Sequence, residues 1–96
     1  MVCIAGLGSS TQAIYVRNMI ENMHGDFKCV FVQWRAQGGV PITSNKLYSM
    51  ASWRDVKEPI DYISRKYKRP MYLFGTSLGA IVSTNYLIHD AEHTPI

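Results

Sequence analysis

The sequence predicts an α/β fold with a three-stranded parallel sheet core flanked by helices. One order of segments occurs three times along the 96 residues: an apolar run, a loop, and a segment with apolar residues at helical spacing. Such alternation is typical of βαβ units, whose strands are parallel. The composition, 47% hydrophobic and 18% charged, agrees with one small globular domain.

The first unit consists of a strand over residues 1–5, the loop "GLGSSTQ" over residues 6–12 and a helix over residues 13–24. Apolar residues recur along the helix at near-helical spacing, and Gly25 follows as a C-cap. The residues of this apolar stripe are Ile14, Val16, Met19, Ile20 and Met23.

The second unit begins with the run "FKCVFVQW" over residues 27–34. It lacks polar alternation across its centre, which predicts a strand buried on both faces. A long loop over residues 35–52 leads to a helix over residues 53–68. Pro59 either kinks this helix, or the regular part of the helix begins just before it. The buried stripe of the helix is Trp53, Val56, Ile60, Ile63 and Tyr67.

The third unit is a strand over residues 70–74 followed by a helix over residues 77–89. Right-handed crossovers bring the loops that follow parallel strands to one edge of the sheet, where ligands bind in open α/β sheets. We therefore expect loop 6–12, loop 35–52 and the turn at Ser77 to lie at the same edge.

The stretch "FGTSLGA" places Ser77 between Gly75 and Gly79, where a strand ends and a helix begins. A serine nucleophile needs such a junction, because a strained turn projects its Oγ above the sheet. The two glycines leave room for a close approach of strand and helix. The alternative is that they serve only tight turns.

A serine nucleophile also needs donors for the oxyanion that develops on the substrate. The helix that starts at Ser77 offers unpaired N–H groups, of which the N–H of Leu78 is one candidate. The loop after the first strand lies at the same edge, so the N–H of Leu7 is the second candidate.

Four segments, "IAGLGSS…YVRNM", "VQWRAQGGVPIT…LY", "DVKEPIDYI" and "GTSLGAIVSTNYL", together resemble the α/β-hydrolase superfamily. They are most similar to its medium-chain acyl-ester esterases and phospholipase-like lipid hydrolases. The resemblance implies a serine esterase or lipase with Ser77 as nucleophile and the Leu7 and Leu78 N–H groups as its oxyanion hole. The family usually has His where this chain has Ala5, Gly where it has Ala36, and Asn where it has Ile81.

A nucleophilic serine needs a histidine base and an orienting acid. His89 and His93 follow Ser77 along or beyond the last helix, and His24 ends the first helix, so we expect none of them to reach Ser77. The family order of serine, acid and histidine places both partners after Ile96. Residues 1–96 are therefore interpreted as a partial α/β-hydrolase domain, the nucleophile-elbow region, which is expected to be inactive alone.

Two other functions remain open. In a Rossmann-like module that binds NADP, "GLGSST" would open the helix and Arg35 would meet the 2′-phosphate, although Thr11 occupies the third glycine position. A non-catalytic hydrolase-like module is the other alternative, suggested by Ala5 and Ala36.

The remaining features limit partners and cofactors. A net charge of +3 and a single basic cluster, "RKYKR" at residues 65–69, agree better with a helix end than with a nucleic-acid interface. Cys3 and Cys29 are interpreted as reduced core thiols, so no metal and no cofactor is expected. The expected partner is a small acyl-ester or lipid substrate, with membrane-surface contact possible in a longer protein. The absence of a signal-peptide pattern favours an intracellular location.

Overall fold

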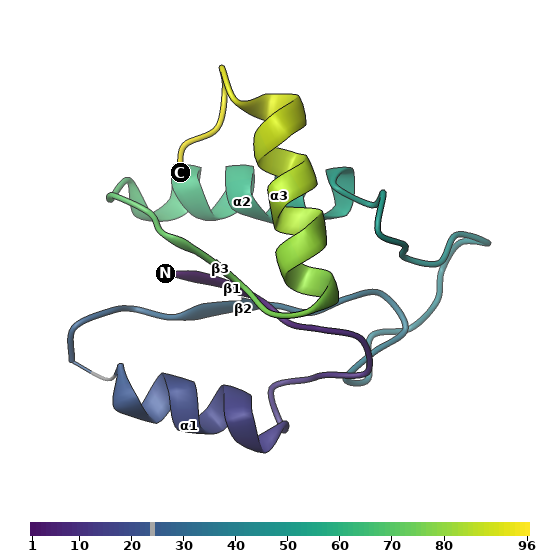
Figure 1. Cartoon of the computed structure of the whole chain (residues 1–96), viewed down its shortest axis with the longest axis horizontal. Helices are drawn as coiled ribbons and strands as arrows, with labels where there is room; N and C mark the ends of the chain where they lie inside the picture. Colours follow the sequence, from purple (N-terminus) through teal and green to yellow (C-terminus); the bar gives the residue numbers. More distant parts are fainter. Residues whose placement is uncertain (24) are drawn as a thin grey trace.

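A computed structural model describes residues 1–23 and 25–96 of the chain, so His24 lies outside the described residues. Strands and helices alternate three times, as the sequence predicts (Figure 1). In chain order they are β1 (Val2–Ile4), α1 (Ile14–Asn22), β2 (Val30–Val32), α2 (Arg54–Tyr67), β3 (Leu73–Gly75) and α3 (Leu78–Asp90).

The three strands form one parallel sheet in the order β2-β1-β3. Cys3 of the central strand is aligned with Phe31 of β2 and with Phe74 of β3. Because the strands are parallel, the segments after their carboxyl ends begin at one edge of the sheet. The expectation that loop 6–12, loop 35–52 and the Ser77 turn start from this edge is confirmed.

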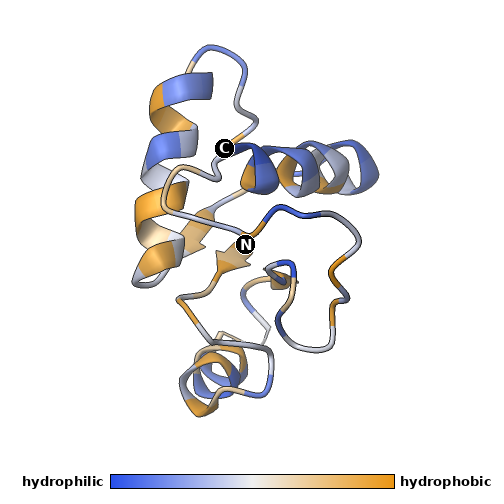
Figure 2. Cartoon of the chain, turned by 90° about the vertical axis from the view of Figure 1, so that its right-hand side faces the viewer, coloured by the Kyte–Doolittle hydropathy of each residue, from blue (hydrophilic) through white to orange (hydrophobic). Residues whose placement is uncertain are grey.

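Helices lie on both sides of the sheet: α1 on one side, α2 and α3 on the other (Figure 1). The side with two helices holds the main core. Of the predicted α2 stripe, Val56, Ile60 and Ile63 are buried there, whereas its two ends, Trp53 and Tyr67, are partly buried. Apolar residues concentrate in the strands and in the part of α3 nearest to them (Figure 2). The most completely buried side chains of this core are Val2, Ile4, Val56, Ile60, Val82 and Tyr86.

The prediction that the second strand is buried on both faces is wrong. Val30, Phe31 and Val32 are all half-buried, whereas the residues of β1 are fully buried. The reason is the strand order, because β1 lies between its two neighbours and β2 lies at an edge of the sheet.

The apolar stripe predicted for α1 is only partly buried. Val16 is the buried residue of this helix, and the side chain of Ile14 is 77% exposed. In the described part of the chain, α1 is the one helix on its side of the sheet (Figure 1). A single helix of nine residues over three short strands buries only a narrow stripe.

Helix α2 includes Pro59 and begins five residues before it, at Arg54. The basic residues Arg65 and Lys66 occupy its last turn, where positive charge is favourable at the negative end of the helix dipole. Lys57 links α2 to α3 by an ion pair with the buried Asp90, with 2.6 Å between Nζ and the carboxylate oxygen.

Candidate functional site

Ser77 occupies the turn between β3 and α3. Its backbone angles are φ 52° and ψ −122°, a region that residues other than glycine rarely adopt. The side chain is exposed. The local path of strand, strained turn and helix is the one required to present a serine Oγ at the edge of a sheet.

The two glycines around Ser77 lie in crowded positions. A Cβ on Gly79 would lie 2.1 Å from the carbonyl oxygen of Ile4, and one on Gly75 would lie 2.8 Å from the backbone N of Ala80. Neither glycine has a positive φ. Close approach of backbones is therefore the reason for glycine at these two positions, and left-handed turn geometry is not.

The loop after β1 reaches Ser77 directly. A Cβ on Gly6 would lie 2.9 Å from the Cβ of Ser77 and 3.4 Å from its Oγ. Gly6 is buried, and the following residue, Leu7, has a side chain that is 69% exposed. The backbone at Gly6 therefore lies directly beside the serine.

The N–H groups of Leu7 and Leu78 donate to no acceptor within residues 1–23 and 25–96. The next N–H groups of α3 are satisfied, because Gly79 donates to Thr76 O at 2.9 Å and Ala80 donates to Ser77 O at 3.0 Å. Leu78 directly follows Ser77 in the chain, and Leu7 directly follows Gly6, the residue of the β1 loop that lies beside Ser77.

A hydroxyl that sequence reasoning missed lies at the same junction. Tyr15, near the start of α1, donates from Oη to Ser9 Oγ at 2.8 Å and lies 3.3 Å from Thr76 Oγ1. The motif "YVRNM" contains this tyrosine, but nothing local in the sequence indicates a contact with the residue before Ser77.

The histidines of the described chain lie away from Ser77. His89 stacks on Trp53, with ring centroids 5.0 Å apart, and lies twelve residues along α3, roughly 18 Å at 1.5 Å per residue. His93 follows the end of that helix, where its N–H donates to Asp90 O. These positions agree with the prediction that neither histidine serves Ser77.

The first residue of loop 35–52, Arg35, forms an ion pair with Asp55 of α2. Arg35 donates from Nε and Nη2 to the two carboxylate oxygens of Asp55, at 2.9 and 2.8 Å. Ala36 follows in a left-handed conformation with φ 61°, which favours glycine. Trp34, at the end of β2, is buried and donates from Nε1 to Ala5 O at 2.8 Å, so the ring packs between the loops.

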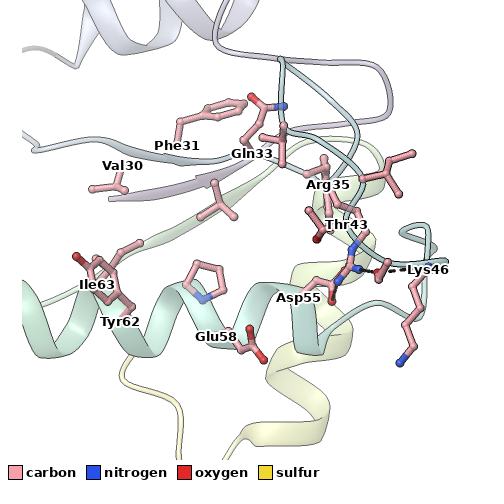
Figure 3. Close-up of a pocket in the computed structure, with 16 residues that line it drawn as sticks. Val30, Phe31, Gln33, Arg35, Thr43, Lys46, Asp55, Glu58, Tyr62 and Ile63 are labelled. Carbon is pink, nitrogen blue, oxygen red and sulfur yellow. Dashed lines mark hydrogen bonds and ion pairs between the residues drawn. The ribbon is translucent and has the colours of Figure 1, made fainter.

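A cavity of about 540 Å³ lies beside β2, between the loop after it and α2 (Figure 3). Apolar side chains such as Val30 and Ile63 line it together with Arg35 and Asp55. Ser77 is not a lining residue of this cavity. The candidate catalytic serine therefore lies on the open surface at the sheet edge and not in this cavity.

No helix in the described residues is both long and apolar enough to cross a membrane. This finding concerns the helices α1, α2 and α3 alone.

Comparison with known proteins gives distant relatives. The chain is 25% identical to the medium-chain fatty acid ethyl ester synthase/esterase 2 of Saccharomyces cerevisiae, over 100% of this chain and 22% of that protein. It is 26% identical to the monoacylglycerol lipase of the same organism, over 100% of this chain and 22% of that protein. It is 25% identical to an abhydrolase domain-containing protein of Dictyostelium discoideum, over 94% of this chain and 24% of that protein.

The chain thus spans less than a quarter of the length of the curated relatives it matches. No family model matches the chain, and no solved structure matches it. The relatives at this identity suggest an α/β-hydrolase relationship, with which a parallel sheet flanked by helices is compatible.

Proposed function

We propose that this chain carries the nucleophile and the oxyanion-binding backbone of a serine hydrolase that cleaves acyl esters of lipids. The observation that carries the proposal is the backbone of Ser77, which is strained at φ 52° and ψ −122° between two glycines where β3 meets α3. Strain of this size is kept where the surrounding structure enforces it, and such positions cluster at functional sites.

In the proposed reaction, Ser77 Oγ attacks the acyl carbonyl carbon while a general base takes its proton. The carbonyl oxygen becomes an oxyanion that accepts hydrogen bonds from the Leu7 and Leu78 N–H groups. The C–O bond then breaks, the alcohol leaves with the proton, and the acyl group remains on Ser77. Water hydrolyses this acyl-enzyme to the free acid and restores Ser77.

The general base is proposed to be a histidine outside these 96 residues, held by an acid. The positions of His89 and His93 support this assignment, because the imidazole of His89 is stacked on Trp53 and His93 follows the far end of α3. Activity is accordingly proposed for the protein that contains the whole triad and not for residues 1–96 alone.

The choice of ester rests on the relatives, two of which are named as a medium-chain fatty acid ethyl ester synthase/esterase and as a monoacylglycerol lipase. We extend to this chain only the class that these names share, fatty acyl esters. Contact with a lipid surface, where such substrates gather, belongs to the same proposal.

The ion pair of Arg35 favours the hydrolase over the dinucleotide-binding alternative. Both carboxylate oxygens of Asp55 accept hydrogen bonds from the guanidinium. An arginine whose guanidinium already donates to a carboxylate is poorly placed to bind a 2′-phosphate, because the phosphate would have to displace the carboxylate.

The test is labelling of the protein, expressed from its complete gene, with a fluorophosphonate probe that reacts with activated serines. We expect one adduct on the peptide that contains Ser77. The adduct is expected to disappear in Ser77→Ala and to persist in Ser64→Ala, a control on α2. Hydrolysis of p-nitrophenyl butyrate should follow the same pattern.

Labelling and ester hydrolysis that survive in Ser77→Ala would overturn the assignment of the nucleophile. A folded protein that neither reacts with the probe nor cleaves the ester would support the non-catalytic hydrolase-like module instead.

A further inference from the structure

Tyr15 contacts both segments of the candidate site, the loop after β1 and the turn at Ser77, although it belongs to neither. Its hydroxyl donates to Ser9 in the loop after β1 and lies within hydrogen-bond distance of Thr76, the residue before Ser77. Tyr15 and Thr76 are 61 residues apart in the chain. The tyrosine itself belongs to α1, a third element.

The surroundings of this hydroxyl are rich in hydrogen-bonding groups. Burial of the phenol raises its pKa, but hydrogen bonds with the hydroxyls of Ser9 and Thr76 and with the backbone of Gly6 lower the pKa of Tyr15 below its usual value of 10.0. The side chain remains 44% exposed. The Tyr15 hydroxyl therefore contacts one hydroxyl on each of the two segments, Ser9 and Thr76, although its ring is only partly buried.

Besides Tyr15, Gln33 also holds the loop after β1, because its Nε2 donates to Ser9 O at 3.4 Å. The Leu7 side chain is exposed, Gly8 has a positive φ of 70°, and Ser9 N–H donates to Gly6 O at 3.2 Å. The direction of the Leu7 N–H is thus set by Gly6 before it and by the turn that ends at Ser9. Of these two residues, Ser9 accepts a hydrogen bond from the Tyr15 hydroxyl.

We propose that Tyr15 is a positioning residue that holds the loop carrying the Leu7 N–H against the turn carrying Ser77. The inference rests on the proposed hydrolase function, because positioning matters only if Leu7 and Ser77 act on the same acyl group. Tyr15 itself needs no contact with substrate. Its effect comes from fixing the donor and the nucleophile relative to each other before the oxyanion forms.

The test variant is Tyr15→Phe in the complete protein, which removes the hydroxyl and keeps the ring. The matched control is Tyr62→Phe, an exposed tyrosine on α2. With p-nitrophenyl butyrate we expect kcat to fall about tenfold in Tyr15→Phe, less than the loss of a whole oxyanion donor. KM and the melting temperature are expected to stay near the wild-type values, since binding and core packing are unchanged.

Thr76→Val provides a second variant, because valine keeps the shape of threonine and loses the hydroxyl. We expect a smaller loss of kcat in Thr76→Val, and the double variant is expected to lose no more than Tyr15→Phe alone. Equal kcat in Tyr15→Phe and wild type, or a fall in kcat matched by a fall in melting temperature, would overturn the positioning role.

Amide hydrogen exchange distinguishes this failure from failure of the hydrolase proposal. We expect exchange over residues 6–10 to accelerate at least tenfold in Tyr15→Phe and to stay unchanged in Tyr62→Phe, whether or not Ser77 reacts with the probe. Unchanged exchange in Tyr15→Phe would overturn the contact itself. Labelling that persists in Ser77→Ala would overturn the proposed function, and with it the positioning role, but would leave the contact of Tyr15 with the loop in place.

Discussion

Gly79 packs against the carbonyl of Ile4 so closely that a Cβ there would lie 2.1 Å from the carbonyl oxygen. The contact joins the first turn of α3 to the end of the central strand. Since Gly79 comes two residues after Ser77, this contact determines how near the serine lies to the sheet.

Gly79→Ala is expected to lower the free energy of unfolding by about 3 kcal/mol, the upper part of the range for overpacking. The oxygen in the way belongs to the backbone of β1, which cannot move without disturbing the sheet. Urea denaturation followed by circular dichroism measures the loss.

The control for this substitution is Thr84→Ala on the exposed side of the same helix, where a change within 0.5 kcal/mol is typical of a surface position. Similar unfolding free energies for Gly79→Ala and the control would contradict the close approach.

Ser77→Gly should make the chain more stable while removing the candidate nucleophile. Strain of roughly 1–3 kcal/mol at a residue with φ 52° is relieved by glycine, whose added chain entropy costs about 0.5–1 kcal/mol. We expect the free energy of unfolding of Ser77→Gly to be about 1 kcal/mol higher than that of Ser77→Ala.

Ser64→Gly, in the interior of α2, is the matched control. We expect this substitution to lower the free energy of unfolding by about 1 kcal/mol, because the backbone of Ser64 is helical. A Ser77→Gly protein less stable than Ser77→Ala would argue against a strained turn.

Ala36→Gly tests the second left-handed residue near the site. Ala36 has φ 61°, a conformation that costs an L-residue with a side chain roughly 1–2 kcal/mol. After the entropy of glycine is subtracted, we expect a gain of about 0.5 kcal/mol in unfolding free energy. Ala36→Val is expected to be less stable than wild type, because β-branched residues tolerate this region poorly. The reverse ranking of the two variants would contradict the backbone angle.

Cys3 is expected to resist alkylation in the folded chain. Burial, reinforced by the neighbouring Cys29 thiol, raises the pKa of Cys3 from 9.0 to about 11. The thiolate is the reactive form, so at pH 8 only about one molecule in a thousand is reactive at this position. Iodoacetamide followed by peptide mapping should find Cys29 modified and Cys3 protected, with both modified at similar rates in urea. Equal rates in the folded chain would contradict the burial of Cys3.

The same pKa predicts a loss of stability at alkaline pH. Because folding raises this pKa, the folded state favours the protonated thiol. The stabilisation is complete below pH 9, declines as the pH rises, and is lost above about pH 11. A flatter profile in Cys3→Ala than in wild type over this window identifies the thiol as the source. Identical profiles in the two proteins would assign the loss to other groups.

Several features of the fold were predictable because they depend on neighbours in the chain. The order of strands and helices follows from apolar runs and helical spacing, and the turn at Ser77 follows from a serine between two glycines where these patterns meet. The α2 stripe of Val56, Ile60 and Ile63 was found in the same way, since residues three and four apart share a helix face.

The positions of β2 and α1 depended on more than local pattern. An apolar run has the same composition in the centre of a sheet and at its edge, so Val30–Val32 was expected to be more buried than it is. Ile14 has the right spacing for a core residue, but a single helix on its side of the sheet leaves it exposed.

The sequence by itself determined the kind of fold, the strand–serine–helix junction and the lack of a histidine near Ser77 along the chain. Only the tertiary structure decided which groups meet there: Gly6 against Ser77, Tyr15 with Ser9 and Thr76, and Arg35 with Asp55. The reason is physical. Backbone conformation and amphipathic spacing are properties of adjacent residues, whereas a contact across twenty or sixty residues depends on how the crossovers bring the loops together.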